Sequence, residues 1–267
     1  MAMTRSGRQP ILDALREKRN VMTAVMLRDM RTRFFNHGLG FLIVSLWPLA
    51  HMLILIGVYT MLGRTAPFGD SLRIFFLTGL IPTLTFVYVS RFMCLSLALN
   101  RPMLAFPVVK VLDIMAARAL LEITAAFLTL FFAFIFLLLL GDSPFPRDPF
   151  QAFYAYLALL LLAIGIGSIA SVITMFFSFF ATLYGLSMIL IYVLSGTLFV
   201  ISAFPESLVY PLSFNPVLHA VEWMRVAYYE GYSDRVLDKE YLIGFGITSL
   251  CLGLLMERVL RRIMLEG

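Results

Sequence analysis

The chain has 267 residues, of which 61% are hydrophobic and only 14% are charged. A soluble domain is about half apolar and about a quarter charged, so this composition excludes an ordinary soluble domain. The net charge of +5 does not indicate nucleic-acid binding, because the basic residues lie at the ends of long apolar runs. We therefore expect an all-α integral membrane protein.

The first 38 residues are polar and basic and lack the short apolar core and cleavage site of a signal peptide. Within them, apolar side chains recur roughly on one helical face, which predicts an amphipathic helix lying in the membrane interface. These residues are Ile11, Leu12, Leu15, Met22, Val25, Met26 and Met30. A solvated helix that only sets the topology is the alternative.

Six apolar segments follow, each close to the roughly 20 residues that cross a bilayer. They cover residues 39–62, 72–97, 114–140, 153–176, 182–201 and 241–260. The fourth and fifth come from one stretch, 149–205, whose 57 residues include no Asp, Glu, Lys or Arg. One helix of that length would run about 85 Å against a hydrocarbon core of about 30 Å, so the stretch must fold back, with a turn expected near 178–185.

The Lys and Arg residues divide unequally between the two sides of this arrangement. Fifteen lie in the N-terminal segment, the connection between the second and third spans and the C-terminal tail, and six lie on the other side. Because positive charge favours the cytoplasmic side, we expect both termini in the cytoplasm and residues 198–240 outside.

The connection between the second and third spans, at about 100–112, has a short apolar piece between two prolines. The prolines prevent one continuous helix, and exposed apolar residues between them predict a docking surface for another protein. The residues concerned are Arg101, Pro102, Met103, Leu104, Phe106, Pro107 and Lys110. A plain interfacial loop is the alternative.

The stretch 198–219 is too apolar for an exposed loop, yet Pro205, Pro211 and Pro216 interrupt it. Proline breaks helix interiors, so the stretch does not fit a simple span. Pro205 followed by Glu206 suits the start of a short helix, because proline fits the first turn and the helix dipole favours an acid there.

A second helix is predicted to begin at Asn215, with Pro216 at its first position, and to run to Glu230. Glu222 and Arg225 are three residues apart on this helix and can pair. Two short helices across 202–231 fit a re-entrant hairpin, which requires a protein-lined or water-filled surround.

No catalytic or metal-binding set is evident in the sequence. The three histidines, His37, His51 and His219, are isolated from other metal ligands. There is no GxxxxGK[ST] loop, so ATP is not bound here by that route. We expect no catalytic residue, metal or cofactor on this chain.

A glycine-containing run at 165–170 matches a relaxed dinucleotide fingerprint, but it lies inside a predicted span with no strand before it. Ala163, Gly167 and Ser171 are instead spaced four apart, which predicts a small-residue stripe for helix packing.

Ionisable residues also lie within or beside the spans. Arg91 is late in the second span, and Asp113, Arg118 and Glu122 are at the start of the third. Arg118 and Glu122 are one helical turn apart and can pair. Charges in a membrane are functional candidates, with snorkelling to the boundary as the alternative.

Several segments together carry a resemblance that covers nearly the whole chain. They are RDMRTRFFNHGLGFL, NRPMLAFPVVK, SGTLFVISAFP and NPVLHAVEWMR, at the first span, between spans two and three, after span five and before span six. This pattern resembles the permease subunit of ABC-2-type polysaccharide exporters, and is most similar to the KpsM-like group that exports capsular polysaccharide from Gram-negative bacteria.

The resemblance implies a cytoplasmic segment at 1–38 with an interface helix and one ABC-2-type transmembrane domain at 39–267 in the inner membrane. Two copies would pair with two ATP-binding subunits that hold ATP and Mg²⁺. The segment 100–112 would be the coupling helix, and 202–231 would be the periplasmic re-entrant helices. A co-polymerase-type adaptor leading to an outer-membrane channel and a lipid-linked acidic polysaccharide would be the further partners.

Two residue sets are hypothesised to lie at the two ends of the polymer path, and whether the charges at the exit face the polymer, the second copy or a periplasmic partner stays open. The substrate entrance would use Arg28, Arg31, Arg33 and Arg91, whose cations suit phosphate or carboxylates. The channel or periplasmic exit would use Tyr59, Phe75, Phe76, Glu206, Tyr210, Glu222, Trp223 and Arg225.

Three alternatives remain open. The same fold can export an O-antigen or teichoic-acid-type polymer or a small lipophilic drug, although a drug exporter more often has a larger external loop or a fused ATPase. An integral-membrane lipid or glycosyl transferase needs acids or histidines gathered at one interface, which the sequence does not provide. A passive scaffold has no use for the proline-interrupted segment at 100–112.

Overall fold

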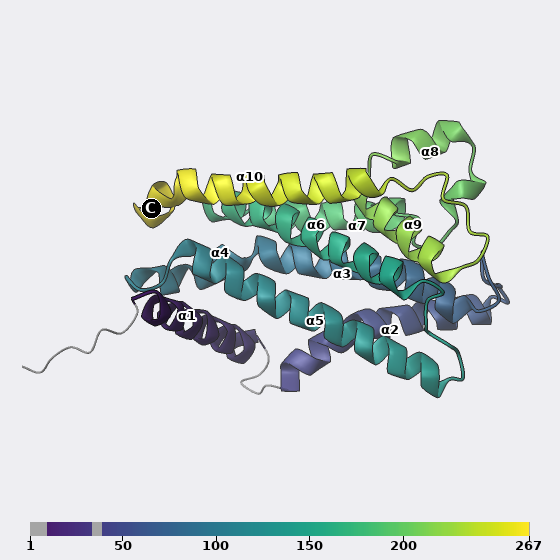
Figure 1. Cartoon of the computed structure of the whole chain (residues 1–267), viewed down its shortest axis with the longest axis horizontal. Helices are drawn as coiled ribbons and strands as arrows, with labels where there is room; N and C mark the ends of the chain where they lie inside the picture. Colours follow the sequence, from purple (N-terminus) through teal and green to yellow (C-terminus); the bar gives the residue numbers. More distant parts are fainter. Residues whose placement is uncertain (1–9, 34–38, 267) are drawn as a thin grey trace, which may run out of the picture.

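The computed structural model describes residues 10–33 and 39–266, and every regular element in these ranges is a helix (Figure 1). The longer elements are α1 (Pro10–Arg33), α2 (Leu39–Met61), α3 (Leu72–Cys94), α5 (Val111–Leu139), α6 (Pro149–Phe176), α7 (Phe180–Leu194), α9 (Pro216–Tyr228) and α10 (Lys239–Glu266). The short elements are α4 (Ser96–Asn100), the 3₁₀ helices η1 (Arg101–Ala105) and η2 (Ile201–Ala203), and α8 (Glu206–Leu212). His37 lies outside the described residues.

Within residues 10–33 and 39–266, five helices are long and apolar enough to cross a membrane, namely α2, α3, α5, α6 and α10. This confirms the all-α class with several membrane-crossing helices. The charge-free stretch does fold back, at residues 177–179 between α6 and α7. However, α7 has only 15 residues, which span about 22 Å, so the helix expected at 182–201 is shorter than predicted.

The early end of α7 has a local cause. Gly196 adopts a φ of +70°, a left-handed conformation that ends a helix and that L side chains rarely adopt. The hydroxyl of Thr197 then donates a hydrogen bond to the carbonyl of Tyr192 at 3.0 Å. The chain continues without regular helix as far as η2.

Small residues let α6 pack closely on its neighbours. A Cβ added at Gly165 would lie 2.7 Å from the backbone N of Leu250, so the backbones of α6 and α10 touch there. On another face of α6, a Cβ added at Gly167 would lie 2.9 Å from the carbonyl oxygen of Ser90 in α3. The hydroxyl of Ser171 shares a hydrogen bond with the hydroxyl of Ser96 at 2.8 Å. The predicted packing stripe is therefore confirmed, and α6 and α10 run side by side along the bundle (Figure 1).

The bundle has two distinct ends. At one, here the α1 end, α1 packs beside α4, η1 and the last turns of α10, where Val25, Leu97 and Met264 share one apolar cluster. At the other, here the α8 end, α8, α9 and the loops between the long helices gather (Figure 1).

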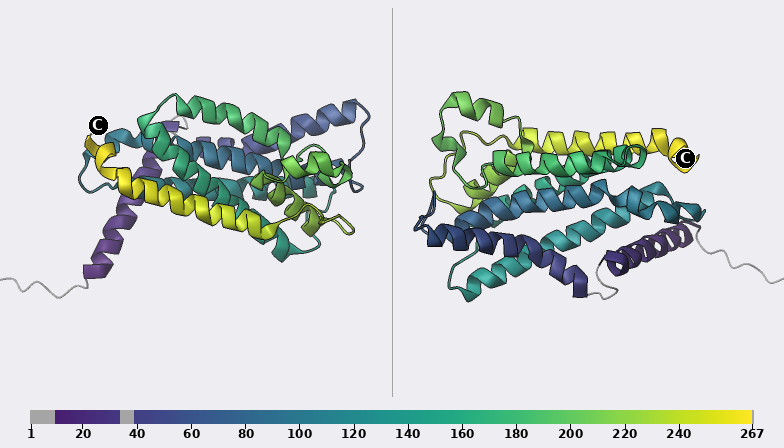
Figure 2. Two further views of the ribbon diagram at one scale, coloured as in Figure 1. Left: turned by 90° about the horizontal axis from the view of Figure 1, so that it is seen from above. Right: turned by 180° about the vertical axis from the view of Figure 1, so that it is seen from behind.

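The predicted N-terminal helix is present, and the last part of its apolar face packs against protein. Met22, Val25, Met26 and Met30 contribute to two apolar clusters with α5 and its neighbours. Residues 13–20 are exposed, and the first turns of α1 extend away from the bundle (Figure 2). Leu15 is therefore exposed and does not share the packing of the later residues, because it lies beyond the edge of the bundle.

Candidate functional site

A groove runs between α3 and α7 in the part of the bundle nearer the α1 end. Two adjoining cavities of about 410 Å³ and 390 Å³ form it, and Arg91, Gly185 and Ile189 line both. We call these two cavities the α3–α7 groove. The other lining residues are His51, Leu84, Val87, Tyr88, Phe92, Leu95, Ala181, Thr182, Leu186, Met188 and Tyr192.

The packing of α7 on α3 leaves room for Arg91. A Cβ at Gly185 would lie only 3.0 Å from the Arg91 Nη1 atom, so the missing side chain lets the guanidinium lie against α7. Arg91 is exposed, although it belongs to a helix long and apolar enough to cross a membrane. An exposed arginine in such a helix suits a wet, anion-binding surface better than contact with lipid.

Aromatic rings flank this cation. Tyr88 stacks on Phe92 with ring centroids 6.4 Å apart, and both rings line the groove. The hydroxyl of Tyr192 lies 3.3 Å from the Nε2 atom of His51, across from α3. A cation beside polar aromatic rings can bind acidic sugars, whose carboxylates pair with guanidinium and whose ring faces cover aromatic faces.

Two other predicted entrance arginines, Arg28 and Arg31, do not line the α3–α7 groove. Arg28 donates from Nη1 to Oδ1 of Asn100 at 3.0 Å, and Arg31 is exposed on α1. The side chain of Arg33 lies outside the described residues. Among the predicted entrance arginines whose side chains the structure describes, only Arg91 therefore lines these two cavities.

The predicted docking segment forms η1 and the turn after it at the α1 end. Met103 and Leu104 pack inward with the apolar cluster around Leu97. The remaining predicted residues, Arg101, Pro102, Phe106, Pro107 and Lys110, are exposed. Phe106 has 62% of its surface exposed, and Val108 beside it has 52%, so the turn after η1 presents apolar surface.

At the α8 end, Glu222 and Arg225 form the predicted pair, with Arg225 Nη1 3.6 Å from Glu222 Oε1. Both side chains are fully buried, so their predicted position at a channel surface is wrong for this chain. Burial raises the pKa of the Glu222 carboxyl, while the charge of Arg225 and the hydroxyl of Tyr232 oppose that shift.

The buried guanidinium of Arg225 holds the chain after α7. Its Nη1 donates to the carbonyl of Phe199 at 2.8 Å, and its Nη2 donates to the carbonyl of Thr197 at 3.2 Å. Its Cζ atom lies 4.3 Å from the ring centre of Phe75. These bonds satisfy backbone groups that the early end of α7 leaves without helical partners. The sequence offered an arginine in a mostly apolar helix and a glycine at position 196, but neither feature by itself indicates this contact.

Three predicted channel aromatics are core residues instead. Phe75 and Phe76 have no exposed surface, because this face of α3 packs into the bundle. Trp223 is also buried and donates from Nε1 to Oε1 of Gln151 at 2.8 Å. Tyr59 is half-buried and meets the Phe76 ring edge-on at 5.0 Å.

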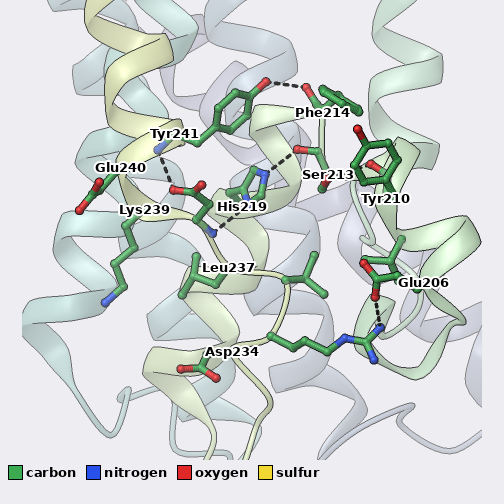
Figure 3. Close-up of a pocket in the computed structure, with 14 residues that line it drawn as sticks. Glu206, Tyr210, Ser213, Phe214, His219, Asp234, Leu237, Lys239, Glu240 and Tyr241 are labelled. Carbon is green, nitrogen blue, oxygen red and sulfur yellow. Dashed lines mark hydrogen bonds and ion pairs between the residues drawn. The ribbon is translucent and has the colours of Figure 1, made fainter.

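Glu206 and Tyr210 line a separate cavity of about 780 Å³ between α8 and the start of α10 (Figure 3). Glu206 pairs with Arg235 at 3.4 Å on its exposed rim. Inside, His219 accepts a hydrogen bond at Nδ1 from the Asp238 backbone and donates from Nε2 to the Ser213 carbonyl, at 3.1 and 2.7 Å. Both ring nitrogens of His219 therefore bond to the backbone, and one of these bonds anchors the segment that precedes α10.

Among the residues that the structure describes, no three His, Cys, Asp or Glu side chains are gathered so that they could hold a metal ion.

Comparison with known proteins identifies the family. No protein-family model matches the chain. Curated relatives nevertheless align along almost its whole length. The polysialic acid transport protein KpsM of Escherichia coli is 31% identical over 246 residues, which cover 91% of this chain and 95% of the relative. The chain belongs to the KpsM family of capsule polysaccharide exporters.

Two further relatives agree with this assignment. The capsule polysaccharide export inner-membrane protein CtrC of Neisseria meningitidis is 25% identical over 243 residues, covering 91% of this chain and 92% of the relative. The capsule polysaccharide export inner-membrane protein BexB of Haemophilus influenzae is 26% identical over 243 residues, covering 89% of this chain and 90% of the relative. This KpsM-family chain is therefore a multi-pass inner-membrane component of capsule polysaccharide export.

Proposed function

We propose that this chain is the permease subunit of an ATP-driven exporter that moves a lipid-linked, acidic capsular polysaccharide from the cytoplasm to the periplasm. The α3–α7 groove carries this proposal, because it joins an exposed arginine to aromatic side chains within helices of membrane-crossing length. The E. coli relatives are named for transport of polysialic acid, a polymer of acidic sugars, and an arginine suits such a cargo.

The chain works as half of a homodimer. Its groove is open on one side, and the helices beside it expose large apolar side chains, such as Trp47 on α2 and Leu186 and Leu190 on α7. A second copy facing this side closes the two grooves into one conduit, and it buries apolar surface on both copies.

Two ATPase subunits, which hold the ATP and Mg²⁺, dock at the α1 end. The exposed ring of Phe106 supports this placement, since an apolar residue on a turn that leaves the bundle suits a groove in a partner protein. The unequal distribution of Lys and Arg supports a cytoplasmic location for this end and for both termini.

The α8 end then faces the periplasm. In this arrangement α7 is the fifth crossing segment, completed by the non-helical chain that Arg225 holds, and α8 and α9 form the re-entrant pair before α10. The cavity between α8 and α10 is the surface offered to a periplasmic adaptor that leads to an outer-membrane channel.

The groove is tested by replacing its cation. Arg91→Gln should lower surface polysaccharide about tenfold or more, because a charged hydrogen bond to the cargo is lost. Arg91→Lys should keep part of the export. Arg64→Gln is the matched control, since Arg64 is an exposed arginine that follows the last residue of α2 and does not line the groove. Equal export by the Gln variant and the wild type, at equal protein levels, would rule out the groove as the polymer path.

A further inference from the structure

Three buried charges link α1 to α5 near the α3–α7 groove. Arg118 donates from Nη1 to Oδ2 of Asp29 at 3.1 Å and also pairs with Glu122, one turn along its own helix. All three side chains are buried. The pairing of Arg118 with Glu122 was expected from their spacing, but the contact with α1 was not.

The same guanidinium supports the groove from behind. Its central carbon lies 4.9 Å from the ring centre of Phe92, and Phe92 lines the groove. Glu122, Phe92 and Tyr88 also border one small cavity of about 30 Å³, and Tyr88 stacks on Phe92. The charge cluster therefore contacts the aromatic wall that flanks Arg91.

On its other side the cluster reaches the segment of η1. Arg28, next to Asp29 on α1, bonds Asn100, which directly precedes η1. Lys18, further back on α1, pairs with Asp113 near the start of α5 at 2.6 Å. Polar links thus join α1, the chain before η1 and the beginning of α5.

Stability alone is a weak reason for such a cluster. Buried ion pairs are often matched or exceeded in stability by apolar residues of similar volume, since their desolvation is costly. Their geometry is harder to replace. A guanidinium can bond two carboxylates along its edges while its face covers an aromatic ring, and an ammonium cannot do this.

We propose that Arg118 is a positioning residue for export: it fixes Phe92 and Tyr88 in the groove wall relative to α1, so that displacement of α1 and η1 moves that wall. This inference rests on the proposed role of the α3–α7 groove. It differs from that role in naming a residue that never meets the polymer.

The first test replaces the whole cluster with apolar residues of similar volume, as Asp29→Leu/Arg118→Met/Glu122→Leu. The variant should unfold thermally at the wild-type temperature or higher, while surface polysaccharide falls about tenfold. The matched control is Arg73→Met/Asp142→Leu, which removes a partly buried pair between α3 and the chain after α5, outside the groove and away from α1. Its export should remain normal. Normal export by the triple variant at normal protein level overturns the proposal.

The second test reads the groove wall without transport. Tyr88→Cys is made in a chain carrying Cys251→Ser, which removes the exposed native thiol and leaves the buried Cys94. The rate of labelling by a soluble maleimide is compared with and without the triple change, or with Arg118→Lys if the triple variant does not accumulate. The rate should change about tenfold. An equal rate overturns the proposal. A changed rate with normal export would show that Arg118 positions the wall but that export does not need this positioning, which overturns its role in export and argues against the groove as the polymer path.

Discussion

At the scale of single residues, burial decides what a charged side chain does in this molecule. The sequence spacing was enough to predict the pairing of Glu222 with Arg225, and that pairing is confirmed. The spacing could not show that both side chains are fully buried, because burial depends on the non-helical chain that Arg225 holds at Thr197 and Phe199. The same limit applies to Phe75 and Phe76, since an apolar helix does not reveal which of its faces meets protein.

Removing Arg225 should therefore destabilise the fold strongly. Arg225→Ala leaves Glu222 buried without its cation and frees two buried carbonyls, and we expect a cost of about 3–5 kcal/mol in the free energy of unfolding. Arg235→Ala is the matched control, since its exposed pair with Glu206 should contribute less than about 1 kcal/mol. Unfolding by sodium dodecyl sulfate in mixed micelles measures both. Similar losses for the two variants would contradict this role of Arg225.

At the scale of elements, the sequence predicted which segments are helical and where the chain folds back. Asn215 caps α9 as expected, accepting from the backbone N of Val217 at 3.1 Å. The length of α7 was not predictable, because apolar composition continues past Leu194 while the conformation of Gly196 ends the helix. The α3–α7 groove was also not predictable as a unit, since its two helices are about 90 residues apart in sequence.

The contact of α6 with α10 gives a prediction at this scale. Gly165→Ala places a Cβ 2.7 Å from the backbone of Leu250, so the two helices must separate, and the protein should unfold at a lower temperature. Gly244→Ala on α10 is the control, because a Cβ there meets nothing within 4 Å. Thermal unfolding in detergent compares them. A wild-type unfolding temperature for the Gly165→Ala variant would show that this contact does not limit the packing of α6.

The segment of η1 gives a second element-scale prediction. Phe106→Asp places a charge where an exposed apolar ring is proposed to enter an ATPase subunit, so co-purification of that subunit should fall about tenfold or more. The fold should be unaffected, because the side chain is mostly exposed. Phe145→Asp, at a similarly exposed phenylalanine far from η1, serves as the control. Equal recovery of the ATPase with both variants would place the docking surface elsewhere.

At the scale of the whole molecule, a single chain supplies one groove with an open side and two chemically different ends. The α1 end combines basic residues with an exposed apolar turn, and the α8 end combines a large cavity with tightly held short helices. Composition and charge distribution were sufficient to predict the membrane class and the order of the segments. The family resemblance supplied the export function, which the relatives then established for this chain.

The most direct measurement locates the polymer in a strain whose own copy of this gene is deleted. Without the chain, lipid-tipped capsular polysaccharide should accumulate in the cytoplasm, and expression of the wild-type chain should return it to the cell surface. Arg91→Gln, expressed at the same level, should leave most of it inside. Surface capsule in the deletion strain without the chain would contradict the central claim that this protein carries the polymer across the inner membrane.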